Sequence, residues 1–173
     1  PDQWRLDPEL SGYGTSVMYL GIYAINTTRF LLGRDPVTVR SDMGSSHEAF
    51  ADVPDERAAS LFVLEDGVRM VSISSQHAHT NTHLEITGTE GRIELRPAFH
   101  GECSLHLARG DVSVTVEHET FDAEREMEAE FDYFADRLLG DAAIHPDVRH
   151  GLLDMRIIEA VHESAERGRP VDL

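Results

Sequence analysis

The sequence contains no lysine. Its 15 basic residues are all arginines and are outnumbered by 32 acidic residues, so the formal net charge is −17. Such a charge repels nucleic acids and anionic membrane surfaces, and we expect neither as a partner. The acidic residues are dispersed along the whole chain, which is typical of a folded protein kept soluble in concentrated salt. An acidic protein from an arginine-rich genome is the alternative explanation.

Several sequence motifs are also absent. Cys103 is the single cysteine, so the chain has no internal disulfide framework and no CxxC metal motif. No apolar run has transmembrane length and no signal-peptide pattern occurs at the start, so we expect a cytoplasmic protein. There is no GxSxG nucleophile motif. The glycines of SGYGTS lack both a preceding strand and the third glycine of a dinucleotide fingerprint, so the residues alone predict no cofactor site.

The hydrophobic pattern predicts an α+β domain over residues 1–173. The expected elements are a helix over 15–32, a strand and three hairpins between 36 and 117, and helices over 123–140 and 147–168. The first hairpin is expected to turn at Asp66-Gly67, which supplies positive φ. Gly33 and Gly168 are placed to end their helices, and Asp147 is the expected N-cap of the last one. We expect an open, predominantly antiparallel sheet of six or more strands with helices on one face. The other face of this sheet is then expected to pack against a further part of the protein or a partner.

The helix over 123–140 carries an apolar stripe. Met127, Phe131, Phe134 and Leu138 follow the spacing i, i+4, i+7, i+11 and are expected to be buried.

Two tyrosines mark the first helix. Tyr19 and Tyr23 are four residues apart, so a regular helix places them on one face, which Asn26 continues. Such a face is either an ordinary wall packed on a sheet or one side of a small polar pocket.

The run QHAHTNTH places His77, His79 and His83 close together in the sequence. A zinc site needs three or four convergent ligands, and this run contains no carboxylate at ligand spacing. We therefore expect no metal site.

The segment WRLDPELSGYGTSVMYLGIYAINTTRFLLG resembles the start of the second domain of the glucose–fructose oxidoreductase (Gfo/Idh/MocA) family. The resemblance continues through HLEITGTEGRIEL and EFDYFADRLLG into HGLLDMRIIEAVHESAERGRPVDL, so it covers nearly the whole chain. Within the family the sequence is most similar to the NADP-dependent D-xylose and glucose dehydrogenase branch, and its acidity points to a haloarchaeal member.

The resemblance implies a two-domain enzyme. An N-terminal Rossmann domain, which we expect to be absent from this chain, would bind NADP or NAD and supply a lysine from an E-K-P motif. The chain itself would be the substrate-binding and oligomerisation domain. Its partners would be a sugar substrate, its own Rossmann domain and a further copy packed on the open sheet face.

The resemblance also assigns roles to residues. Tyr23 matches the catalytic tyrosine, which takes the proton of the sugar hydroxyl and needs an ammonium group beside it to act as a base. Tyr19 stands where the family usually has Asp, and with Asn26 it is a candidate sugar contact. Trp4 and Arg5 lie in the matched lead-in near the expected cleft.

His79 is the last candidate for substrate binding, because it falls on a strand whose end faces the pocket in the family. The function implied is oxidation of an aldose such as xylose or glucose by hydride transfer. The alternative is a non-catalytic, sheet-mediated assembly module whose tyrosine stripe is only core. The tyrosine at position 19 favours that alternative.

Overall fold

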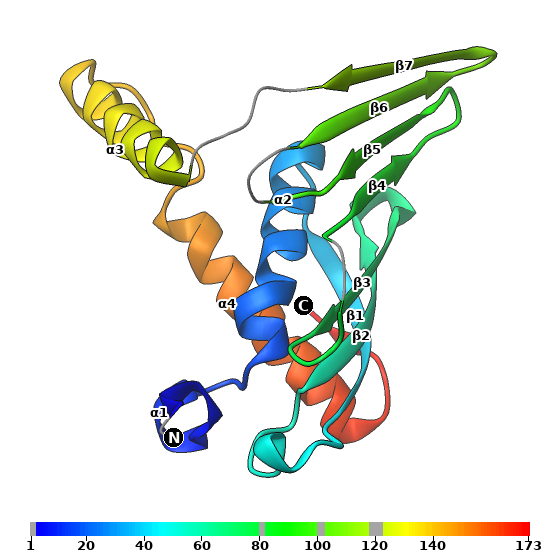
Figure 1. Ribbon diagram of the computed structural model, residues 1–173, viewed down its shortest axis with the longest axis vertical. Coiled ribbons are helices and arrows are strands. Elements are labelled where there is room, and N and C mark those ends of the chain that lie inside the picture. Colours follow the sequence, from blue (N-terminus) through cyan, green and yellow to red (C-terminus); the bar gives the residue numbers. More distant parts are fainter. Residues whose placement is uncertain (1–2, 80–81, 100–102, 118–122) are drawn as a thin grey trace. The chain divides into compact units, whose positions relative to one another are not determined.

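A computed structural model describes residues 3–79, 82–99, 103–117 and 123–173 (Figure 1). The chain divides into two compact units, each of which is described by itself. The first unit comprises the residues up to Ala78 together with Pro146–Leu173, and the second comprises His79–His145.

The first unit combines a four-stranded antiparallel sheet with helices. Its main elements are α1 (Pro8–Ser11), a π-helical turn (Val17–Gly21), α2 (Ile22–Leu32), β1 (Pro36–Gly44), β2 (Arg57–Leu64), β3 (Arg69–Ser75), α4 (Val148–Arg167) and β8 (Val171–Asp172). The strand order is β3-β2-β1-β8, so the last strand of the chain pairs with the first. Short 3-10 turns lie at Trp4–Leu6, Glu48–Phe50 and Glu65–Gly67.

The core of the first unit lies between one face of this sheet and the helices. Alternation along β1 and β2 turns Val39, Phe62 and Leu64 toward the helices, where all three are buried. Ile25 of α2 and Ile157 of α4 are buried in the same cluster. Figure 1 shows α2 and α4 beside the strands of this sheet. Burial of these apolar side chains is the main stabilising contribution in this unit.

Local signals set the ends of the long helices. Gly33 has a left-handed φ of 59° after α2, and Gly168 has a φ of 62° after α4. The Asp147 side chain accepts hydrogen bonds from the backbone N–H groups of Arg149 and His150, as an N-cap does. The predictions at these three positions are confirmed. The turn between β2 and β3 likewise uses positive φ at Asp66 and Gly67, as predicted.

The second unit contains a separate antiparallel sheet and one helix. Its elements are β4 (Leu84–Thr87), β5 (Arg92–Arg96), β6 (Ser104–Arg109), β7 (Val112–Glu117) and α3 (Ala123–Leu139), and the strands follow the order of the chain. The register aligns Glu85, Glu94, His106 and Thr115 across the four strands, so one face of this sheet is polar.

Two expectations need correction. The sheet of six or more strands is not seen, because the described strands form two sheets of four. The predicted burial of Met127, Phe131, Phe134 and Leu138 is wrong: all four side chains are exposed on α3. The reason is that, within the second unit, α3 makes no extensive contact with the described strands.

Among the described residues, no helix combines the length and the apolar character that crossing a membrane requires.

Candidate functional site

Three of the predicted site residues form one aromatic and cationic cluster. The rings of Trp4 and Tyr19 meet edge to face, with centroids 6.1 Å apart. The Arg5 guanidinium lies 4.7 Å from the centre of the Trp4 ring and 5.0 Å from that of Tyr19. Cation–π contacts of this kind hold a guanidinium in place by attraction to the ring faces. We call Trp4, Arg5 and Tyr19 the aromatic cluster.

Tyr23 lies on α2 immediately after the π-helical turn that contains Tyr19. Its side chain is 41% exposed, so the tyrosine stripe is not simply buried core. The π-helical turn accommodates more residues than an α-helical turn, so the two tyrosines are not related by one regular α-helical turn. Single π-helical turns inside helices are frequent at functional sites.

Asn26 is part of a buried ionic network. Its amide nitrogen donates to Oδ2 of Asp154 at 2.7 Å. Arg29 forms an ion pair with the same carboxylate and a second pair with Asp35, at 2.8 Å from Nε to Oδ1. The Arg29 and Asp154 side chains are only 4% and 3% exposed. Asn26 thus has a structural contact that the sequence did not indicate.

His79 belongs to the second unit, is exposed and lies between β3 and β4, so the expectation that it falls on a strand is wrong. The other five predicted site residues lie in the first unit. The structure therefore brings Trp4, Arg5 and Tyr19 together, with Tyr23 and Asn26 farther along the same helical segment.

The sequence analysis did not identify Asp55. This fully buried residue contacts the N-terminus of the helical segment that carries Tyr19 and Tyr23. Its Oδ1 accepts from the backbone N–H of Thr15 at 2.6 Å and its Oδ2 accepts from that of Val17 at 2.8 Å. This is an N-terminal cap supplied from 40 residues away. N-cap residues are predicted from the residues directly before a helix, so a cap from a distant residue such as Asp55 is not predicted.

The next residue, Glu56, is a second carboxylate that accepts hydrogen bonds from backbone N–H groups. Glu56 accepts from the backbone N–H of Ser46 at 2.6 Å and from that of His47 at 3.0 Å. These bonds lower the pKa of Glu56 from 4.5 to about 2. The ring of His77 lies 3.4 Å from the Glu56 carboxylate and packs on the His47 ring, with centroids 4.4 Å apart. Glu56 thus fixes the loop after β1.

Tyr13, in the glycine-rich entry to the helix, contacts α4. Its hydroxyl donates to Oε1 of Glu159 at 3.1 Å, and this bond raises the pKa of Tyr13. Its ring packs on His162, with centroids 5.5 Å apart. His162 is 7% exposed, and its Nε2 has no hydrogen-bond partner among the described residues.

The burial of His162 predicts a specific pH dependence. Desolvation lowers its pKa from 6.5, against the opposing pull of Asp55 and Glu166. Between pH 6.5 and the lower pKa of His162 in the native state, the unfolded chain therefore binds a proton that the native state does not. Over this window the free energy of unfolding decreases as the pH decreases. One such proton contributes at most about 1.4 kcal/mol per pH unit.

We expect His162→Gln to flatten this dependence, because glutamine does not titrate. The measurement is the thermal midpoint of the full-length protein and its variant from pH 8 to pH 5. Parallel curves for the two proteins would contradict the assignment.

Among the described residues of the second unit, three side chains form a grouping of possible metal ligands. His83, Glu85 and Glu94 have ligand atoms within 4.8 Å of one another. Arginines already balance both carboxylates, with Arg92 3.8 Å from Glu85 and Arg96 3.6 Å from Glu94. We therefore describe the grouping as a cross-strand ion-pair network.

The glycine-rich entry does not fit a dinucleotide-binding turn. Such a turn joins a strand to a helix, whereas Gly12 and Gly14 follow the short helix α1. This chain's glycines are therefore not assigned to a cofactor.

The first unit thus carries the aromatic cluster and, farther along the same helical segment, the exposed Tyr23. Comparison with known proteins gives the family. The chain belongs to the Gfo/Idh/MocA oxidoreductases, because residues 1–173 match the family model described as the C-terminal alpha/beta domain of the oxidoreductase family.

Two curated relatives come from haloarchaea. The chain is 45% identical over 175 residues to D-xylose 1-dehydrogenase [NADP(+)] of Haloarcula marismortui, covering 100% of the chain and 48% of the relative. It is 30% identical to D-xylose 1-dehydrogenase (NADP(+)) 2 of Haloferax volcanii, covering 99% of the chain and 51% of the relative. The chain spans about half the length of these relatives.

Solved structures share the fold. The aldose-aldose oxidoreductase from Caulobacter crescentus, complexed with glycerol, matches with a TM-score of 0.88 at 26% identity, over 100% of this chain and 51% of that one. An NAD-binding oxidoreductase from Klebsiella pneumoniae matches with a TM-score of 0.83 at 19% identity, over 99% of this chain and 54% of that one. The resemblance to the family seen in the sequence is thus confirmed.

Proposed function

We propose that this chain is the substrate-binding domain of an NAD(P)-dependent oxidoreductase that oxidises an aldose such as D-xylose or D-glucose. The observation that carries the proposal is the 45% identity over the whole chain to a D-xylose 1-dehydrogenase [NADP(+)]. The exposed Tyr23, next along the helix from the aromatic cluster, supports it. The nicotinamide cofactor would be held by the half that lies outside this chain.

Tyr23 is the residue to which we assign proton transfer. In the oxidation of an aldose at C1, the nicotinamide would accept the hydrogen of C1 as a hydride and the C1–O bond becomes double. The Tyr23 oxygen, as a phenolate kept deprotonated by an ammonium group from outside this chain, would accept the hydroxyl proton. A positioned phenol within hydrogen-bond reach of that hydroxyl is what the step requires from this chain. The aromatic cluster supplies faces on which a sugar ring can lie, and Arg5 supplies N–H donors for sugar hydroxyls.

The direct test is an assay of the full-length protein. Purified protein with D-xylose or D-glucose should reduce NADP⁺ or NAD⁺, followed as the absorbance of the reduced cofactor. Absence of activity with any aldose and either cofactor would contradict the proposal. An inactive protein that still assembles would leave the non-catalytic assembly module, which Tyr19 in place of Asp favours.

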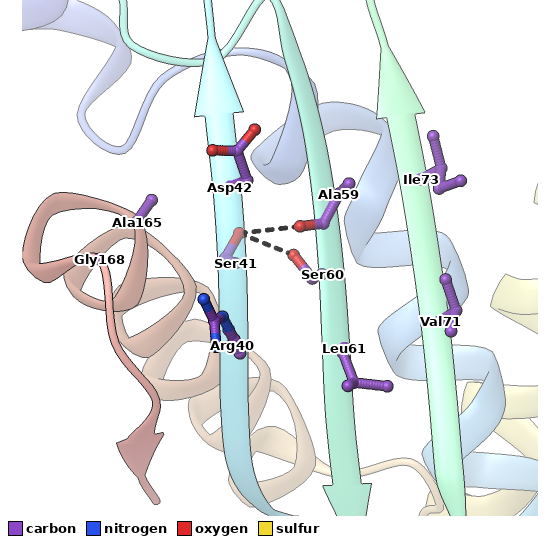
Figure 2. A pocket seen from close by; sticks show the side chains of 10 residues that line it. All are labelled: Arg40, Ser41, Asp42, Ala59, Ser60, Leu61, Val71, Ile73, Ala165 and Gly168. Carbon is purple, nitrogen blue, oxygen red and sulfur yellow. Dashed lines mark hydrogen bonds between the residues drawn. The ribbon is translucent and has the colours of Figure 1, made fainter.

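We further propose that the face of the β3-β2-β1-β8 sheet opposite its helices binds a second copy of the chain. Leu61, Val71 and Ile73 are 43%, 69% and 78% exposed on this face. They line an open hollow of about 350 Å³ together with Arg40 and Asp42 of β1 (Figure 2). Opposite charges beside an apolar strip are self-complementary across a two-fold axis. None of the predicted site residues lines this hollow.

We expect Ile73→Asp to convert the full-length dimer or larger assembly into monomers, because the carboxylate would be buried against apolar groups. The measurement is sedimentation in molar potassium chloride, with Val148→Ser as the control, since Val148 is an exposed apolar residue of α4 away from this sheet face. Less salt should weaken the assembly, because the charge of −17 per chain is then poorly screened. A monomeric wild-type protein in molar salt would contradict the proposal.

A further inference from the structure

The buried carboxylate of Asp55 holds the N-terminus of the helical segment that carries Tyr19 and Tyr23. Both oxygens of Asp55 are engaged with backbone N–H groups, those of Thr15 and Val17. We propose that Asp55 is a positioning residue for the reaction: it sets the place of Tyr19 and Tyr23 through the backbone that carries them. This inference rests on the function proposed above.

Other bonds attach the same turn to the same place. The backbone oxygen of Asp55 accepts from the Thr15 hydroxyl at 3.0 Å and from the Ser16 N–H at 3.1 Å. The Ser16 hydroxyl donates to Ser74 at 2.8 Å, and the Gln76 amide donates to the Thr15 carbonyl at 3.1 Å. The first turn is therefore fixed to Asp55, two residues before β2, and to the end of β3. Hydrogen bonds to a buried carboxylate are among the stronger ones.

Gly14 shows how closely the carboxylate fits. A Cβ at position 14 would overlap Oδ1 of Asp55, and the φ of Gly14 is +84°, which side chains rarely adopt. The glycine-rich entry thus permits the carboxylate to reach Thr15. The bond from Asp55 to Thr15 therefore depends on the glycine at position 14, although 40 residues separate Thr15 from Asp55.

The positions of Tyr19 and Tyr23 depend on Val17, because one continuous helical segment carries all three residues. The π-helical turn begins at Val17, whose N–H Asp55 holds, and continues through Tyr19 to Gly21. Because α2 follows without a break, a displacement of Val17 moves both phenols. A displacement of about 1 Å at reacting groups costs about 10²-fold in rate. A cap that only stabilised the fold would not have this effect at temperatures far below unfolding.

The experiment compares variants of the full-length protein. Asp55→Asn keeps the shape but replaces one acceptor oxygen by an amide that cannot accept from an N–H. Gly14→Ala leaves Asp55 present but displaces its carboxylate. Asp147→Ala is the control for the loss of a cap, because Asp147 caps α4, which carries neither tyrosine.

We expect Asp55→Asn and Gly14→Ala each to lower kcat by about 10–100-fold, with little change in the Kd of the cofactor, when assayed well below the thermal midpoint. The double variant should lose no more than the worse single one, because both changes remove the same interaction. Amide hydrogen exchange at Thr15 and Val17 should become faster in both. Asp147→Ala should lower the thermal midpoint and leave kcat unchanged.

Two failures can be told apart. A wild-type protein that oxidises no aldose overturns the proposed function, and this inference with it. An active wild type whose Asp55→Asn variant has faster exchange at Thr15 and Val17 but undiminished kcat overturns the positioning role alone.

Discussion

Replacing Tyr23 by Phe in the full-length protein should lower kcat for aldose oxidation by about 10²–10⁴-fold, the usual contribution of a positioned acid or base. The substitution removes one oxygen from a side chain that is 41% exposed, so the ring still packs and the fold should survive. Steady-state kinetics with an aldose and NADP⁺ give the result. The Kd of the cofactor should be nearly unchanged, because Tyr23 is assigned only to the proton step.

Tyr19→Phe is the matched control for this prediction, because it removes the same atom from the tyrosine of the aromatic cluster. It should raise KM more than it lowers kcat, as expected of a residue that contacts substrate without transferring its proton. Tyr19→Asp restores the residue more usual in the family and is expected to be the least harmful change there. A Tyr23→Phe protein as active as its parent would remove the catalytic assignment.

Replacing Asp154 by Ala should destabilise the protein by about 3–5 kcal/mol, because it leaves the Arg29 guanidinium buried without this partner. The Arg29 and Asp154 side chains are only 4% and 3% exposed, so solvent poorly compensates the guanidinium for the lost carboxylate. The amide of Asn26 also loses its acceptor. Urea unfolding of the full-length protein gives the free energy from the midpoint and slope.

Two comparisons separate this cost from a general effect on α4. Glu163→Ala breaks an exposed pair with Arg167 in the same helix and should cost less than about 1 kcal/mol. The double variant Arg29→Met/Asp154→Leu removes both charges and should lose far less than Asp154→Ala alone. Equal losses for Asp154→Ala and Glu163→Ala would contradict the description of a buried pair.

Features of the fold that depend on neighbouring residues could be predicted from the sequence. Gly33, Gly168 and the Asp147 cap act within one helical turn, and the turn at Asp66-Gly67 depends on local φ. These predictions are confirmed because the same residues that form the pattern also make the contacts.

Features that depend on distant residues could not be predicted. Asp55 caps a helix 40 residues before it, and Arg29 pairs with Asp154 across 125 residues. The division of the strands into two sheets and the pairing of the short β8 with β1 also depend on tertiary contacts. Periodicity reports which face of an element is apolar, but not what packs on it, and this is why α3 was wrongly expected to be buried.

Contacts of the predicted site residues also depend on residues that are distant in the sequence. Trp4, Arg5 and Tyr19 come together as a cluster, although Trp4 and Tyr19 are separated by a helix and a glycine-rich turn. Asn26 has an additional structural bond to Asp154 that no local pattern indicates. The assignment of substrate contacts to Trp4, Arg5, Tyr19, Asn26 and His79 stays a prediction.

The most direct measurement is a crystal structure of the full-length protein with NADP⁺ and D-xylose. The account predicts that the Tyr23 hydroxyl lies about 2.6–3.2 Å from the sugar hydroxyl that loses its proton, with the sugar beside Tyr19. A sugar bound to the nicotinamide site with the Tyr23 hydroxyl out of hydrogen-bond reach, and with no water bridging them, would contradict it.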